Sequence, residues 1–253
     1  MTQITSRLPR CFLVLCICSI FVGVSWSADD KNQSDIDKRI DASAKVLNEI
    51  MGTPDKAIPD KVMSGAKCIA VIPSMVRIAV GFGGSHGKGV ATCRTSHGWS
   101  APAPITITGG SWGLQFGGQA VDLVMVVMNQ SGMDHLLSSK FKLGADATAA
   151  AGPVGRDVGA DTDIKMRSEV LTYSRARGLF AGIDLNGSAL TQDKDETRLL
   201  YGKFQPFDAI LHGEVQPTAS SRPFLAAVRK YSAQSKGKET SSNTGAGEAD
   251  TSR

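Results

Sequence analysis

Long apolar runs are nearly absent from this 253-residue chain, and the single one lies close to its start. The run from Cys11 to Val24 has 14 residues, fewer than the roughly 20 that a helix needs to cross a bilayer. A polytopic membrane protein is therefore excluded. Two arginines precede the run, and small residues follow it at positions 25 and 27, which is typical of a secretory signal peptide. We predict a signal peptide over residues 1–27, cleaved after Ser27 or Ala28; an uncleaved N-terminal anchor is the alternative.

The chain also lacks a large excess of positive or negative charge. The formal net charge is +4, and it falls to +2 if the predicted leader is removed with its two arginines. Domains that bind nucleic acid usually carry a strongly basic patch or stripe. This sequence has neither zinc-finger spacing nor basic residues interleaved with aromatic ones. We therefore expect no nucleic-acid partner.

Cysteine is also rare outside the predicted leader, which holds three of the five cysteines. The remaining two, Cys68 and Cys93, each lie in a run typical of a β-strand. In an oxidising compartment such a pair predicts a disulfide if the two strands are neighbours. The bridge would close a 25-residue span and stabilise the fold by about 3–4 kcal/mol. Two free buried thiols are the alternative.

Complete catalytic motifs are missing as well. The nucleophile pattern G-x-S-x-G occurs twice, around Ser85 and around Ser111. An active serine of this kind needs a strand before it and a helix after it. The residues after Ser85 are typical of another strand, and the glycine-rich residues after Ser111 are poor helix formers. We expect no enzyme, and a serine hydrolase is the least favoured function.

Cofactor and metal motifs are incomplete in the same way. Gly87 and Lys88 are followed by Gly89, where a phosphate loop requires Ser or Thr. The four histidines are scattered along the chain without the spacing of metal ligands. Asp193 and Asp195 lack the glycine and the distal glutamate of a calcium loop, so we assign them to a solvated turn. We therefore expect no cofactor and no metal.

The patterns that are present predict an α+β fold. Residues 34–51 have an amphipathic helical period, with Ser34 as a candidate N-cap, and residues 59–65 are typical of a second, short helix. From residue 67 to 127, short runs of Val, Ile and Phe are broken by Gly, Pro or Ser about every ten residues, which is typical of antiparallel strands. Further strands are predicted at 169–174, 179–184 and 188–192. We expect a curved, mostly antiparallel β-sheet with the N-terminal amphipathic helix packed on it.

The end of the chain has two parts. Residues 204–231 have enough apolar residues for a last strand or helix, whereas residues 232–253 are polar, without apolar periodicity, and are predicted to be disordered. No internal repeat or second hydrophobic core is visible. We therefore expect one domain at 67–231, forming a single fold with a helical segment at 28–66.

Basic residues cluster near predicted turns and strand ends. Lone surface charges need no special explanation, so an ordinary solubilising surface is the simplest interpretation. The alternative is a site for anionic lipid head groups, in which glycine-rich backbone and Lys or Arg side chains act together. On a strand, Tyr173, Arg175 and Arg177 would share one face. The candidate lipid-binding residues are Lys88, Lys140, Lys142, Arg156, Tyr173, Arg175 and Arg177.

An ordered series of motifs covers the chain from about residue 67 to 203. Its stretches are 81–90, 98–102, 109–117, 122–125, 141–146, 151–156, 173–182 and 201–202, including GFGGSHGKGV, GGSWGLQFG and YSRARGLFAG. With this series the chain resembles the SYLF domain family, the lipid-binding module of Ysc84-type actin-patch proteins and of many bacterial secreted proteins. The resemblance implies binding of phosphoinositides and other anionic lipids, helped by an N-terminal amphipathic segment. It implies no catalytic triad.

This sequence differs in two features from the eukaryotic members of the family that it resembles. The predicted leader, together with a polar C-terminal segment in place of an SH3 module, argues against an actin or endocytic role and predicts a bacterial secreted member. We expect a periplasmic or secreted protein, free or peripheral on a membrane. Its expected function is non-enzymatic binding of anionic, phosphoinositide-like phospholipid head groups at a membrane surface. A structural or protein-interaction module of the cell envelope is the alternative.

Overall fold

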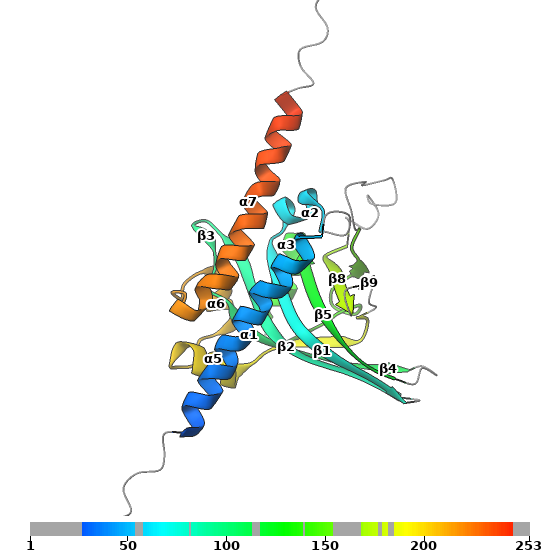
Figure 1. Ribbon diagram of the computed structural model, residues 1–253, viewed down its shortest axis with the longest axis vertical. Helices are drawn as coiled ribbons and strands as arrows, with labels where there is room; N and C mark the ends of the chain where they lie inside the picture. Colours follow the sequence, from blue (N-terminus) through cyan, green and yellow to red (C-terminus); the bar gives the residue numbers. More distant parts are fainter. Residues whose placement is uncertain are drawn as a thin grey trace, which may run out of the picture.

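The computed structural model describes residues 27–53, 58–80, 82–112, 117–138, 140–153, 168–176, 179–181 and 185–244. Most of the predicted signal peptide, residues 1–26, lies outside these ranges, so the leader stays a prediction. Figure 1 shows a strongly curved sheet with two long helices, α1 and α7, lying across one of its faces. The α+β class and the packing of the N-terminal helix on the sheet are confirmed.

The sheet has ten strands in the order β6-β10-β4-β2-β1-β5-β8-β7, with β3 paired to β2 and β9 paired to β8. Every pair of strands is antiparallel except β7 and β8. The strands are β1 Cys68–Val80, β2 Phe82–Thr95, β3 Gly98–Trp99, β4 Ala103–Trp112, β5 Gly117–Val127, β6 Lys140–Lys142, β7 Ala149–Ala151, β8 Val170–Ala176, β9 Leu179–Ala181 and β10 Ser188–Gln192.

Helices lie on both sides of this sheet. They are α1 Ser27–Met51, α2 Asp60–Gly65, α3 Gln130–Leu137, α5 Lys194–Tyr201, α6 Phe207–His212 and α7 Arg222–Thr244, with the 3-10 turn η1 Ala219–Ser221 before α7. Among the described residues, no helix is sufficiently long and apolar to span a bilayer. The segment 204–231 thus holds α6, η1 and the start of α7 and no strand, and α7 continues to Thr244, into the segment that we expected to be disordered. Residues 245–253 lie outside the described ranges.

Two hydrophobic clusters fill the two faces of the sheet. Alternate residues of each central strand point to opposite sides, so that in β1 Ile69 and Val71 face α1, α2 and α7, whereas Cys68 and Ala70 face α3 and α6. We call the first side the α1 face and the second the opposite face. Both clusters are fully buried near the middle of the sheet, which explains the continuous apolar runs that the sequence shows there.

Helix α1 packs through one apolar side. Ile36, Ile40, Leu47 and Ile50 are spaced by multiples of a helical turn and have no exposed surface. They contact β1, β2 and α7, and Asn48 accepts a hydrogen bond of 2.9 Å from the hydroxyl of Tyr231 in α7. The helix begins at Ser27. Ser34 therefore lies inside it and is not the N-cap that the sequence suggested.

Strand β1 is one long strand, although Pro and Ser lie within it as in the breaks that the sequence analysis placed between short strands. Pro73 and Ser74 interrupt its apolar pattern, but they form a β-bulge, because one extra residue of β1 lies between its partners on β2 and β5. Ser74 has a positive φ of 51°, and its backbone N–H donates to an Asp122 carboxylate oxygen at 3.0 Å. The bulge keeps the strand paired on both sides beyond this point.

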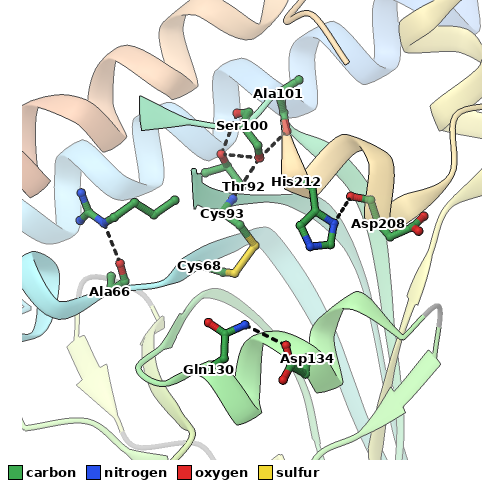
Figure 2. The surroundings of a disulfide bond; sticks show 11 residues. Ala66, Cys68, Thr92, Cys93, Ser100, Ala101, Gln130, Asp134, Asp208 and His212 are labelled. Carbon is green, nitrogen blue, oxygen red and sulfur yellow. Dashed lines mark hydrogen bonds between the residues drawn. A yellow bond between two sulfur atoms is a disulfide. The ribbon is translucent and has the colours of Figure 1, made fainter. Parts of the chain in front are cut away.

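A disulfide joins the two central strands β1 and β2, as Figure 2 shows. Cys68 and Cys93 are partners in the antiparallel register, and neither has exposed surface. Ser100 supports the bridge from the side, because its hydroxyl accepts the backbone N–H of Cys93 at 3.0 Å while its carbonyl accepts the hydroxyl of Thr92 at 2.8 Å. The predicted pairing is confirmed in the structure.

Candidate functional site

Most of the candidate lipid-binding residues lie on three separate strands of the sheet. Lys88 is in β2, Lys140 and Lys142 are in β6, and Tyr173 and Arg175 are in β8. Arg156 and Arg177 lie outside the described residues. Regular registers connect these strands through β10, β4, β1 and β5. Side-chain alternation then places Lys88, Lys142, Tyr173 and Arg175 on the α1 face.

Lys88 is held by two carboxylates. Its ammonium nitrogen lies 2.8 Å from an oxygen of Asp193 and 2.9 Å from an oxygen of Glu196. Burial alone would lower the pKa of Lys88, but hydrogen bonds and charge from these two acids outweigh it and raise that pKa. Arg39 of α1 pairs with the same Glu196. The group connects α1, β2 and α5, so the charge of Lys88 is balanced within the protein.

Asp193 has a second role as the N-cap of α5. One of its carboxylate oxygens accepts the backbone N–H of Glu196 at 3.1 Å, and the other accepts the hydroxyl of Thr106, also at 3.1 Å. Burial works to raise the pKa of Asp193, but these bonds and Lys88 lower it overall. The assignment of Asp193 to a solvated turn is thus wrong. The spacing of Asp193 and Glu196 is a helix-capping pattern that could have been found in the sequence.

Arg175 is also balanced by acids. Its guanidinium bonds Asp122 of β5 at 2.9 Å and pairs with Glu49 of α1. The hydrogen bond that the Arg175 guanidinium donates to the Asp122 carboxylate is the main reason that the pKa of Arg175 is raised. The Arg175 side chain is only 19% exposed. Together with the pair between Arg39 and Glu196 of α5, this contact holds α1 in place at its middle and near its C-terminal end.

Tyr173 and Lys142 differ sharply in exposure. Tyr173 is buried in the cluster beneath α1, its ring packs against the backbone of Gly152, and burial raises the pKa of its hydroxyl. Lys142 is exposed, and no ion pair involves its ammonium group among the described residues. A lipid-binding role stays a prediction for both residues, but as the structure stands only Lys142 is accessible to a head group.

Lys142 begins a row of side chains that runs across six strands. The row follows the registers from β6 through β10, β4, β2 and β1 to β5, and all its members are exposed or half-buried. No acidic residue belongs to it. We call it the cross-strand row; its residues are Lys142, Ala189, Thr108, His86, Val76 and Ala120.

Replacing Arg175 by Gln should destabilise the fold measurably. The change leaves Asp122 without its cation and leaves Glu49 only its exposed contact with Lys45, and it removes a tie between α1 and the sheet. We expect a loss of about 1–2 kcal/mol, between the values for exposed and buried ion pairs. Urea unfolding would measure it. The matched control is Arg198→Gln, whose exposed pair with Asp195 should matter little; equal effects of the two changes would contradict the prediction.

The two serine motifs lie within strands. Ser85 is in β2 opposite Gly109, and Ser111 is in β4 opposite Gly83. Neither serine is at the turn from a strand to a helix that a nucleophile of this type requires. The described residues also contain no cluster of His, Cys, Asp or Glu that could hold a metal ion. The glycines of these motifs therefore belong to strand packing.

Comparison with known proteins identifies the family. Residues 108–231 match the family model described as "Ysc84: Las17-binding protein actin regulator". The chain is 34% identical over 186 residues to "SH3 domain-containing YSC84-like protein 1" of Xenopus laevis, covering 70% of this chain and 55% of that protein. It is 30% identical over 193 residues to "LAS seventeen-binding protein 3" of Saccharomyces cerevisiae, covering 72% and 42%. The chain belongs to the Ysc84 family.

Membership of the Ysc84 family confirms the resemblance that the glycine-rich motifs suggested. The chain spans about half the length of the curated relatives that it matches. These Ysc84-family relatives are vertebrate and yeast proteins, so they give no support to the expectation of a bacterial secreted member. Export and location remain predictions. The relatives are named as binding or regulatory proteins, which is compatible with a non-enzymatic Ysc84 domain.

Proposed function

We propose that this Ysc84-family domain binds anionic phospholipid head groups at a membrane surface and is not an enzyme. The observation that carries the proposal is the cross-strand row, which is accessible on the α1 face and contains Lys142 and His86 but no acidic residue. Lys88 and Arg175 contribute less, because each is already paired with two carboxylates.

The chemistry of the row suits a phosphate-bearing head group. A lysine close to an anionic membrane contributes about 1 kcal/mol to binding. The hydroxyl of Thr108 and the imidazole of His86 can donate hydrogen bonds to phosphate oxygens beside it. Since one cation gives weak binding alone, we expect an affinity that depends on many anionic lipids in a surface rather than on one tightly held molecule.

Co-sedimentation with vesicles tests the proposal. The full-length chain should bind vesicles of phosphatidylcholine with phosphatidylserine or a phosphoinositide, bind pure phosphatidylcholine much less, and lose binding as salt rises. Lys142→Gln should weaken binding to anionic vesicles about three- to fivefold. The control is Lys203→Gln, an exposed lysine in the segment between α5 and α6. Equal binding to neutral and anionic vesicles would overturn the proposal.

A protein partner is the second candidate. The family is described as Las17-binding, and the matched yeast relative carries the same partner in its name. This chain covers 42% of that yeast protein, so the part that binds Las17 there need not be shared. A pull-down with purified Las17 separates the candidates. Binding of Las17 without selectivity for anionic vesicles would favour an interaction module.

A further inference from the structure

Four strands extend beyond the helices as a curved projection, visible at the lower right of Figure 1. It starts at the bulge in β1, and we call it the β arm. By the registers it consists of residues 74–80 of β1, 82–87 of β2, 107–112 of β4 and 117–121 of β5. Helix α1 crosses the sheet nearer its middle and leaves the α1 face of the arm uncovered.

The uncovered side of the arm is apolar. Val76 is 46% exposed and Ile78 is 56% exposed, and with Phe204 they are the large exposed hydrophobic residues among those described. Both belong to the α1 face, because their partners His86 and Gly84 continue the regular alternation of Lys88 in β2. Two of the three exposed large hydrophobics thus stand two residues apart on one bare surface.

Glycines make this surface flat around Ile78. Its partners on the two neighbouring strands are Gly84 and Gly118, and Gly84 is opposite Gly110 on the next strand. A Cβ added at Gly110 or Gly118 would meet no atom within 4 Å, so the space above these glycines is open. Ile78 therefore projects above its glycine partners on the neighbouring strands.

The other side of the arm is polar beyond its base, where Met75, Ile107 and Val121 belong to the buried cluster on the opposite face. Arg77 lies between Ser85 of β2 and Gln119 of β5 in the register, on the side opposite Val76 and Ile78. Among the described residues of the arm, the exposed aliphatic side chains thus lie on the uncovered face. An exposed apolar patch rimmed by polar groups marks a surface that is covered in the working protein.

We propose that the apolar side of the β arm docks into the interfacial layer of an anionic lipid bilayer. Val76 and Ile78 enter the boundary between head groups and acyl chains, while His86 and Lys142 of the same row face phosphates. This deepens the proposed function and rests on it. Charge favours this occupant, because the exposed Lys142 stands in the same cross-strand row and the described residues on the α1 face of the arm include no Asp or Glu.

The size of the patch favours a bilayer over a protein. A stable protein interface buries about 800 Å² on each partner and is built around well-packed side chains. The described part of the patch offers two aliphatic side chains between glycines. Shallow insertion needs little shape complementarity, since its strength follows the apolar area buried plus the attraction to anionic lipids.

Tryptophan placed at two matched positions tests the contact directly. Ile78→Trp and Phe204→Trp add an indole at two exposed hydrophobic positions on different parts of the surface. The full-length variants are mixed with phosphatidylserine vesicles containing brominated phosphatidylcholine, which quenches indoles that reach the acyl chains. We expect clear quenching of the indole emission added at position 78 and little quenching of that added at position 204. The emission of the native tryptophans, which both variants share, is the reference. Equal quenching at the two positions would overturn the inference.

Affinity gives an independent readout. Val76→Ser with Ile78→Ser should raise the apparent Kd for anionic vesicles about tenfold, given the aliphatic area that leaves water, whereas Phe204→Ser should change it less than twofold. If the wild-type chain binds no anionic vesicles, the proposed function itself fails. If it binds them and the double variant binds equally well, only the role of the arm fails. Conversion of a dimer to a monomer by the double variant, with vesicle binding unchanged, would assign the patch to a second copy instead.

Discussion

Replacing Gly89 by Ala is expected to lower the free energy of unfolding by about 3 kcal/mol or more, or to prevent folding. A Cβ at this position would lie 2.1 Å from the carbonyl oxygen of Val71 and 2.8 Å from the Cα of Ile72. Both atoms belong to the backbone of the neighbouring central strand, at the start of the bulge in β1. They cannot move aside as a flexible side chain can. Urea unfolding followed by circular dichroism would measure the loss.

Gly110→Ala is the matched control. Gly110 also lies in a strand of the same sheet, but an added Cβ there meets nothing within 4 Å. Because alanine restricts the unfolded chain more than glycine does, this variant should be as stable as the wild type or slightly more stable. Similar losses in the two variants would show that glycine is needed at these positions for a reason other than close approach.

Removing the disulfide is expected to have the second large effect. Cys68→Ala with Cys93→Ala should cost about 3–4 kcal/mol, because the bridge closes 25 residues of chain in the unfolded state. The surroundings cannot compensate, since both cysteines lie in the fully buried cluster on the opposite face. Guanidinium unfolding of the wild type and the double variant would give the difference.

Thiol titration provides the accompanying check on the bridge. Neither cysteine has exposed surface, so a reductant should leave the bridge intact in the native protein and reach it only after denaturant is added. Oxidised, denatured protein should show no reactive thiol from these two positions. Two titratable thiols there would refute the disulfide, and an unchanged stability of the double variant would refute its contribution.

The local pattern of apolar residues predicted those helices and strands that depend on residues close together in the sequence. The apolar period of residues 34–51 is the buried side of α1, and the runs around Cys68 and Cys93 are paired strands. Other features depend on contacts between segments that are distant in the sequence, and these cannot be recognised from the local pattern. The bulge at Ser74 looks like a strand break until pairing on both sides carries β1 through it.

The candidate site shows the same limit. Lys88, Lys142 and Arg175 lie on one face of the sheet, but the sequence does not say which of these cations already have partners. The acids that balance Lys88 follow it by more than 100 residues, and one of the acids that balance Arg175 precedes it by 126. Those pairings exist only after the sheet brings β2, β8 and the helices together. The exposed row that starts at Lys142 could be recognised only from the registers.

The bulge in β1 also determines which side of the β arm is apolar. Before it, odd-numbered residues such as Val71 face α1; after it, even-numbered ones do, because one extra residue reverses the alternation. If the chain kept its length but paired as a regular strand without the bulge, Arg77 would face α1, and Val76 and Ile78 would lie on the other side. A one-residue deletion near Ser74 would instead restore a regular strand in the present register, so Val76 and Ile78 would stay on the α1 face. The bulge therefore absorbs one extra residue of β1 and keeps the apolar side chains of the arm on the α1 face.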